Sequence, residues 1–293
     1  MTPVIAPVVD AHLHTFRAVS DRYPRDVHEL FPADLEAPVE DYLATMDRHG
    51  IDHAVLVPLS PHDEYLRECL ELEPQRFAGI GVHDSASRDP VANLHRRVEE
   101  TGIQGLRVHH LGDPATADVT ELETFPLLSA MADVGHKLWF YGSSAQLQLL
   151  GRVLDALPRL VVVLNHLGFC QQGYLKDAYG RPRIATELPP PTLPTVERYA
   201  AFEHVHVMFS GEYAFSTEPF PFDDLASTVR ALHAAYGSDR LLWASDYPWI
   251  VKEPGYGPQM ELVDHYLPGL EEDERAAIMG GNAARLFGFG GLG

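Results

Sequence analysis

The sequence lacks most of what would mark a secreted, membrane-bound or nucleic-acid-binding protein. Its 293 residues include two cysteines, Cys69 and Cys170, too few for a disulfide framework and not spaced as a C-x-x-C metal motif. There is no run of eighteen apolar residues, so we expect no membrane span, and the first residues do not follow the pattern of a secretory signal. Basic residues number 22 against 42 acidic ones, and a net charge of −20 argues against a nucleic-acid partner. These absences favour a cytoplasmic protein.

What the sequence does contain is an alternation of short apolar runs with helical patterns. Several of the runs are continuously apolar, as in strands that helices cover on both faces. The expected strands are 4–10, 53–57, 77–82, 105–108, 137–141, 160–164, 205–209 and 241–244. The expected helices are 39–49, 62–73, 90–101, 123–134, 145–156, 196–202, 223–236 and 271–279. This alternation predicts βα units around a parallel sheet.

The number of units predicts the fold class. Eight strand–helix pairs are what a closed (β/α)₈ TIM barrel needs, and we expect one such domain over residues 1–293. Two connections are long, 15–38 after the first strand and 168–194 after the sixth. Both follow strands, so both would lie at the C-terminal mouth of the barrel, where such enzymes keep their active sites. We expect these two loops to cover the site.

Four ligand-type side chains recur at the ends of predicted strands. His12 and His14 end the first strand, and side chains two residues apart in a strand share a face. His166 follows the sixth strand and Asp246 the eighth. Imidazole and carboxylate groups are ligands for zinc and its neighbours. The set predicts one divalent metal, with zinc the expected ion, and a water that the metal acidifies and Asp246 deprotonates.

At these residues the sequence resembles the amidohydrolase-related branch of the metal-dependent hydrolase superfamily. The resemblance extends over nearly the whole chain and rests on the segments 10–14, 105–109, 165–168, 244–249 and 281–287. It implies a distorted TIM barrel. The family contains lactonases, hydrolases of amides and esters, and non-oxidative decarboxylases of aromatic or unsaturated acids.

The fifth predicted strand departs from the commonest family pattern. Many members carry a histidine at its end, where this chain has Tyr141, and no lysine ends the fourth strand, so a two-metal site is not expected. Tyr141 resembles the pyrone-dicarboxylate lactonase type, which acts without a metal. Two mechanisms therefore stay open: a single metal activates the water, or the same histidines polarise the substrate carbonyl while Asp246 activates water. In either, Tyr141 could hydrogen-bond the leaving oxygen and His166 would be catalytic.

Other residues at strand ends are candidates for substrate binding. Arg107 ends the fourth strand, and its guanidinium could hold a substrate carboxylate through two hydrogen bonds. Arg22 and Arg25 in the first long loop could extend this clamp, His109 could line the mouth, and Trp249 could form an apolar wall.

The sequence thus predicts a hydrolase of a small cyclic or carboxylated molecule, whether lactone, ester or amide. A decarboxylase is the first alternative, but the members we compare with it carry a further histidine after the seventh strand, and 208–212 offers none. A non-catalytic ligand-binding barrel is the second, and the cost of gathering four ionisable groups argues against it. The sequence leaves a homo-oligomer open.

Overall fold

The computed structural model describes residues 6–291, and its centre is a ring of parallel strands. Two further strands form a separate antiparallel hairpin. The ring strands are β1 (Val9–Leu13), β2 (His53–Leu56), β3 (Phe77–Gly79), β4 (Gly81–Val82), β5 (Gly105–Val108), β6 (Lys137–Phe140), β7 (Val161–Leu164), β10 (Val205–Phe209) and β11 (Leu241–Trp243). The hairpin strands are β8 (Tyr174–Lys176) and β9 (Pro182–Ile184).

The ring of strands is divided into two sheets, and backbone hydrogen bonds connect these sheets at both junctions. Its strands form one sheet of order β1-β2-β3 and a second of order β11-β10-β7-β6-β5-β4. β3 and β4 are one strand interrupted at Ile80, whose amide donates to the Leu56 carbonyl at 3.0 Å. Beyond β11, the Asp246 amide donates to the carbonyl of His12 at 3.0 Å and joins the last strand to the first. The predicted distorted (β/α)₈ barrel is confirmed.

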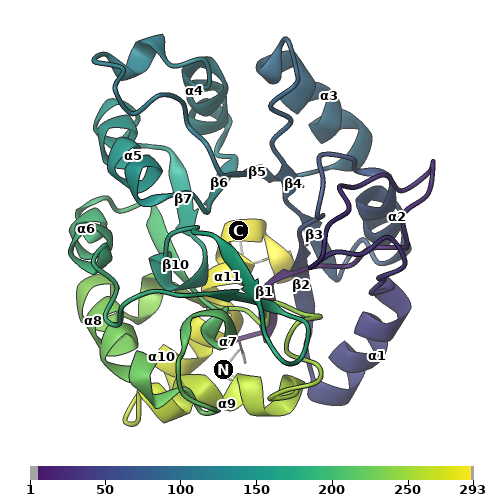
Figure 1. Ribbon diagram of the computed structural model, residues 1–293, viewed down its shortest axis with the longest axis vertical. Coiled ribbons are helices and arrows are strands. Elements are labelled where there is room, and N and C mark those ends of the chain that lie inside the picture. Colours follow the sequence, from purple (N-terminus) through teal and green to yellow (C-terminus); the bar gives the residue numbers. More distant parts are fainter. Residues whose placement is uncertain (1–5, 292–293) are drawn as a thin grey trace.

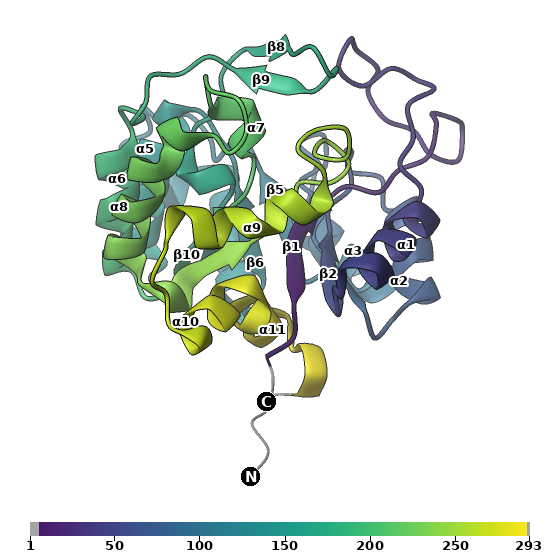
Figure 2. The ribbon, with the colours of Figure 1, turned by 90° about the horizontal axis from the view of Figure 1, so that it is seen from below.

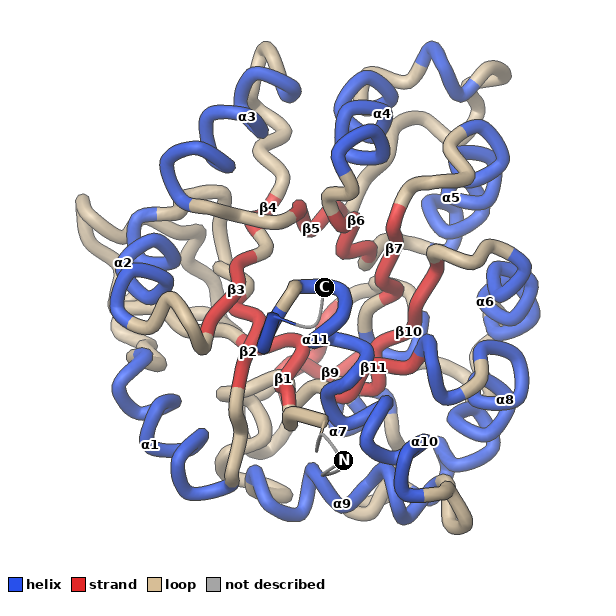
Figure 3. Tube along the Cα trace, turned by 180° about the vertical axis from the view of Figure 1, so that it is seen from behind, coloured by secondary structure: helices blue, strands red, loops and turns tan. Residues whose placement is uncertain are grey.

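Helices surround the strands, as Figures 1 and 3 show. The outer helices are α1 (Val39–His49), α2 (Glu64–Leu72), α3 (Pro90–Thr101), α4 (Phe125–Val134), α5 (Ser144–Ala156), α6 (Leu193–Arg198), α8 (Ala226–Tyr236) and α9 (Tyr256–Tyr266). Shorter ones are α7 (Glu212–Phe215), α10 (Glu272–Ala276) and α11 (Asn282–Phe287). None of the helices in this part of the chain is long and apolar enough to cross a membrane.

One end of the barrel is closed by the C-terminal helices, which leaves the other as the mouth. Inside the ring, Trp139 of β6 packs with Phe287 of α11, their ring centroids 5.7 Å apart. Ala283 and Ala284 join the same buried apolar cluster as Val9 at the start of β1. Because this end is filled by side chains, polar groups at the carboxyl ends of the strands lie at the open end.

The first strand begins later than predicted. The expected range was 4–10, of which residues 4 and 5 lie outside the described part of the chain, whereas β1 runs from Val9 to Leu13. Pro7 has no amide hydrogen to donate to a ladder, and pairing with β2 begins only at the Val8 carbonyl, which accepts from the Asp52 amide. The shift places His12 within the strand and His14 directly after it.

The two long connections lie on the mouth side of the barrel (Figure 2). The segment 15–38 is largely irregular, with two isolated bridges, one between Phe16 and Ala37 and one between His28 and Phe31. The segment 168–194 contains the β8–β9 hairpin, which sequence patterns did not predict. In Figure 2 the hairpin extends toward the first long segment, so that both lie across the same end of the ring.

Candidate active site

A cavity of about 250 Å³ opens at the mouth of the barrel. Strand ends form its floor, and both long segments contribute to its walls. The lining residues are His14, His28, Phe31, Pro58, Leu59, Val82, Arg107, His109, Tyr141, His166, Gln171, Tyr174, Pro182, Ile184, Gly211, Tyr213, Ala214, Phe215, Asp246 and Trp249. Aromatic rings, imidazoles, one carboxylate and one guanidinium therefore face the same small space.

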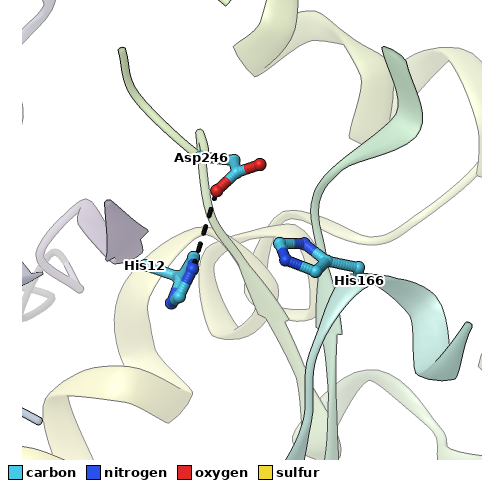
Figure 4. Close-up of side chains that lie close together, drawn as sticks. All are labelled: His12, His166 and Asp246. Carbon is cyan, nitrogen blue, oxygen red and sulfur yellow. Dashed lines mark ion pairs between the residues drawn. The ribbon is translucent and has the colours of Figure 1, made fainter. Parts of the chain in front are cut away.

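Asp246 offers an unpaired carboxylate oxygen to the site. Its Oδ2 accepts a hydrogen bond from the Tyr213 hydroxyl at 2.7 Å, whereas Oδ1 has no partner among the described residues. Oδ1 lies 3.6 Å from Nε2 of both His12 and His14 (Figure 4 shows the first of these contacts). Burial raises the pKa of Asp246 to about 6, against the hydrogen bond from Tyr213 and the charge of Arg107, which lower it. A carboxylate of this kind can accept a proton from water.

The histidines around Asp246 are held by different partners. His14 Nδ1 lies 2.7 Å from the Val57 carbonyl oxygen, and His12 Nδ1 lies 3.1 Å from the indole nitrogen of Trp139. His166 adopts a left-handed φ of 50°, and its Nδ1 lies 3.0 Å from the Ser210 hydroxyl. Burial is the largest cause that lowers the pKa of all three imidazoles, which favours their neutral forms.

Arg107 is a buried guanidinium without an ion pair. It makes no hydrogen bond or salt bridge to the residues at 6–291, its Nε has no partner, and it lies over the Tyr141 ring at 5.5 Å. Its charge lowers the pKa of His12, His14, His109 and His166. A guanidinium left unpaired in a cavity is available to a carboxylate of a ligand.

Comparison with known proteins agrees with this geometry. The sequence model of a family described as amidohydrolase matches residues 9–289. The chain belongs to the amidohydrolase family. It is therefore a hydrolase, as the sequence predicts.

Three relatives of this amidohydrolase are named for cyclic esters. It is 25% identical to a 4-sulfomuconolactone hydrolase of Rhizobium radiobacter over 95% of this chain and 89% of that one. It is 27% identical to an L-fucono-1,5-lactonase of Burkholderia ambifaria, over 95% and 94%. A solved structure from Pseudomonas putida, proposed to be a 2-pyrone-4,6-dicarboxylic acid hydrolase, is 26% identical with a TM-score of 0.73, and 98% of each chain is covered.

Three of the four predicted metal ligands of the amidohydrolase lie close together. His12, His166 and Asp246 bring one ligand atom each within 4.8 Å of one another, and His14 is outside this group. Two observations oppose a cation here: Arg107 already adds positive charge, and the Trp139 indole hydrogen points at Nδ1 of His12. Three of the four predicted ligands thus lie close enough to share one ion, and the metal site stays a prediction, which the contact of His12 with Trp139 opposes at that ring.

Of the predicted substrate-binding residues, the structure brings some to the cavity and not others. His109 and Trp249 line it, and the His109 Nδ1 lies 2.7 Å from the Tyr141 carbonyl oxygen. Arg22 and Arg25 do not. Arg22 is exposed and paired with Glu68. Arg25 donates instead to the backbone carbonyls of Phe31, Pro32 and Leu35.

Among the residues that sequence reasoning missed, two form hydrogen bonds with predicted site residues. Tyr213 donates to Asp246. It lies four residues after Phe209, the last residue of β10, and this position after a strand end could have indicated a residue of the site. Trp139 contacts His12 from 127 positions away. It lies in a run of apolar residues, which predicts only a buried strand, so no local pattern could have found it.

Proposed function

We propose that this amidohydrolase opens a small lactone that carries a carboxylate group. The observation that carries the proposal is the pair of unpaired groups in one cavity, the guanidinium of Arg107 and Oδ1 of Asp246. The first would bind the substrate anion and the second would deprotonate water. Three relatives are named for lactones, which supports a cyclic ester as the substrate. One of them is named for a 2-pyrone dicarboxylate, which supports a carboxylate on that substrate.

The reaction follows from these positions. Asp246 takes a proton from water, and the oxygen attacks the lactone carbonyl carbon to give a tetrahedral oxyanion. The ring C–O bond then breaks, and the leaving oxygen takes the proton back from Asp246. One water is consumed and one hydroxy acid is formed, with no change of oxidation state.

Tyr141 and His166 would act on the oxygens of the substrate. Burial raises the pKa of Tyr141 well above its ordinary value, so its hydroxyl stays a hydrogen-bond donor toward the leaving oxygen. If Ser210 donates to Nδ1 of His166, the Nε2 of that ring carries the hydrogen and can polarise the carbonyl. His109 and Trp249 would shape the walls.

A metal is usual in this family and would polarise a carbonyl and acidify water. Because the hydrogen bond from Trp139 opposes a metal on His12, the proposed reaction relies on the side chains of this chain alone. Related decarboxylases usually carry a further histidine after β10, and residues 208–212 offer none. There, Gly211 packs so closely that a Cβ would lie 2.7 Å from the His166 Nδ1, which leaves no room for a longer side chain.

The role of Arg107 is tested with two lactones of the same ring, one with a carboxylate and one without. We expect Arg107→Gln to lower kcat/KM for the carboxylated lactone by about 100-fold, the usual cost of removing one partner of a buried charge pair. The neutral lactone should change by less than about threefold, because it does not use the guanidinium. Arg22→Gln is the matched control, since Arg22 does not line the cavity and is paired with Glu68. Equal losses for both lactones would contradict a carboxylate site.

The role of Asp246 is tested separately. Asp246→Asn keeps the shape of the side chain but cannot accept the proton, and we expect kcat to fall by about 10²- to 10⁴-fold. A variant that retains wild-type kcat on every lactone that the wild type opens would overturn the proposed base.

A further inference from the structure

His12 and His14 belong to one short motif, but the Nδ1 atoms of their rings have partners of opposite kind, an acceptor for His14 and a donor for His12. Their ring centroids are 4.8 Å apart and the rings are perpendicular. Nδ1 of His14 faces the Val57 carbonyl oxygen, which can only accept, so Nδ1 carries the hydrogen and Nε2 a lone pair. Nδ1 of His12 faces the indole nitrogen of Trp139, which can only donate, so Nδ1 carries the lone pair.

The position of the second nitrogen of His12 follows from this contact. A neutral imidazole has one hydrogen, which must then be on Nε2. An imidazolium would set a second N–H against the indole N–H. Nε2 has no partner among residues 6–291 and lies 3.6 Å from Oδ1 of Asp246, which also has none. Both atoms are buried, so each needs the other or a shared water.

We propose that Trp139 is a positioning residue that fixes His12 as an Nε2–H donor toward Asp246. The proposal deepens the proposed function, since it rests on Asp246 as the base. A water beside Oδ1 could donate to Asp246 and to Nε2 of His14 while it accepts from Nε2 of His12. The indole thereby orients the attacking water although it touches neither water nor substrate.

The same contact removes His12 from the ligands of any divalent metal. A histidine binds a metal through a lone pair, and its other nitrogen normally donates to an acceptor that fixes this tautomer. Here the outer partner of His12 is a donor, so the nitrogen that faces the site is protonated. In this chain Trp139 thus opposes the metal that the H-x-H motif suggests.

A role in packing alone is the competing explanation for Trp139. The ring fills the closed end of the barrel against Phe287, so its loss would lower stability whatever the tautomer of His12. The two explanations differ in what they predict for His12. If Trp139 only fills space, either nitrogen of His12 can carry the hydrogen. If the indole hydrogen bond fixes the tautomer, the hydrogen is on Nε2.

The first test observes the tautomer in the wild-type protein, with histidine labelled with ¹⁵N and His12→Ala used to assign its signals. Two-bond ¹H–¹⁵N correlations distinguish the nitrogen that carries hydrogen from the one that does not. We expect His12 to carry it on Nε2 and His14 on Nδ1. A His12 with its hydrogen on Nδ1 would overturn the proposal. This measurement needs no variant of Trp139 to fold and no substrate, so it is independent of the lactonase proposal.

The second test titrates the purified protein with zinc chloride and compares Trp139→Phe with Trp243→Phe. Trp243 is as deeply buried in β11, but its indole nitrogen has no partner in the described chain, so the control loses the same ring without a hydrogen bond. We expect Trp139→Phe to bind zinc at least about tenfold more tightly than wild type, an effect typical of outer partners of metal ligands. Trp243→Phe should match wild type, and adding His12→Ala to Trp139→Phe should abolish the gain. A wild type that binds one zinc tightly through His12, with no gain in Trp139→Phe, would refute the proposal.

Discussion

At the scale of the residue, the mouth is built on unusual backbone conformations. Asp246 and His166 adopt left-handed φ angles of 57° and 50°, which residues other than glycine rarely adopt. Gly211, with φ of 77°, lies against His166 so closely that a methyl group there would be 2.7 Å from Nδ1. Strain of this kind is common where a site fixes its reacting groups.

Gly211→Ala should therefore damage the site more than the fold. The new methyl group would displace the His166 ring, and we expect kcat to fall at least about tenfold, because misplacing a reacting group by an ångström costs that much or more. Gly50→Ala is the control: it has a similar φ of 68° but open space around a Cβ. Each substitution should cost about 1 kcal/mol of stability for the left-handed backbone. Steady-state kinetics and urea unfolding measure both, and equal kinetics in the two variants would contradict the role of Gly211.

Glu212 should make stability depend on pH. It is fully buried, and among the described residues its Oε2 accepts from the Gln259 amide whereas Oε1 has no partner. Burial raises its pKa from 4.5 to about 7. Between these values the unfolded chain loses the proton and the folded chain keeps it, so stability falls as pH rises from 4.5 to 7.

Glu212→Gln removes this loss because an amide does not titrate. Relative to wild type, we expect the variant to gain up to about 3 kcal/mol of unfolding free energy between pH 4.5 and pH 8, from 1.36 kcal/mol per pKa unit. Glu261→Gln, on the exposed face of α9, should show no such gain. Urea titrations at the two pH values test this, and a Glu212→Gln gain that is independent of pH would contradict it.

At the scale of the element, one arginine fastens the β8–β9 hairpin over the site. Arg181 precedes β9 and is buried. Its guanidinium pairs with Asp177 Oδ2 at 2.7 Å and with Glu253 Oε2 at 2.9 Å. The same group lies 4.7 Å from the centroid of Tyr213, the ring whose hydroxyl donates to Asp246. The hairpin thus contacts the residue that hydrogen-bonds Asp246, the proposed base.

Arg181→Ala should release this hairpin. We expect KM to rise by about tenfold and limited proteolysis to cut within 174–184, since the variant leaves Asp177 and Glu253 without their cation. Arg183→Ala is the control, because Arg183 lies two residues further on, within β9, and has no ion pair to a described residue. Unchanged proteolysis in Arg181→Ala would show that the hairpin is held by its apolar contacts instead.

The elements that sequence patterns predicted best are those that packing and local preference both favour. β5 and β10 have the predicted bounds because each is a short, mostly apolar run that helices cover, interrupted by one polar residue, Arg107 and His206 respectively. α9 was missed because Gly257 and Pro258 resemble a turn, although proline is well suited to the first turn of a helix. The long predicted helix 271–279 is instead α10 followed by a π-helical turn over Ala277–Gly281, where Gly280 has no helical conformation.

At the scale of the whole molecule, the net charge of −20 opposes the approach of an anionic substrate. The screening length falls from about 30 Å at 0.01 M salt to about 10 Å at 0.1 M. For a carboxylated lactone we expect kcat/KM to rise by about two- to fivefold over this range of sodium chloride. The neutral lactone serves as the control and should not respond. A fall in kcat/KM with salt would mean that the local charge of Arg107 outweighs the rest of the molecule.

How much of the site could be predicted also depends on the topology of the barrel. The positions of His14, His166 and Asp246 followed from strand ends, because parallel strands of a barrel place their carboxyl ends together. The contact between His12 and Trp139 depends on how β1 and β6 face each other across the ring, and the pairing of Arg22 with Glu68 depends on the path of an irregular segment. Neither is encoded in a local pattern.

The unpaired guanidinium of Arg107 also means that binding of a carboxylate to the cavity should raise the thermal stability of the protein. An anion that pairs with it stabilises only the folded state, by about 2.7 kcal/mol at a hundredfold excess over Kd. In a chain of this length such a gain raises Tm by roughly 5 °C. A library of cyclic and open-chain carboxylates, screened by thermal shift without any assay of turnover, would therefore rank ring size and substituents directly. The melting curve of Arg107→Gln would identify the compounds that bind elsewhere.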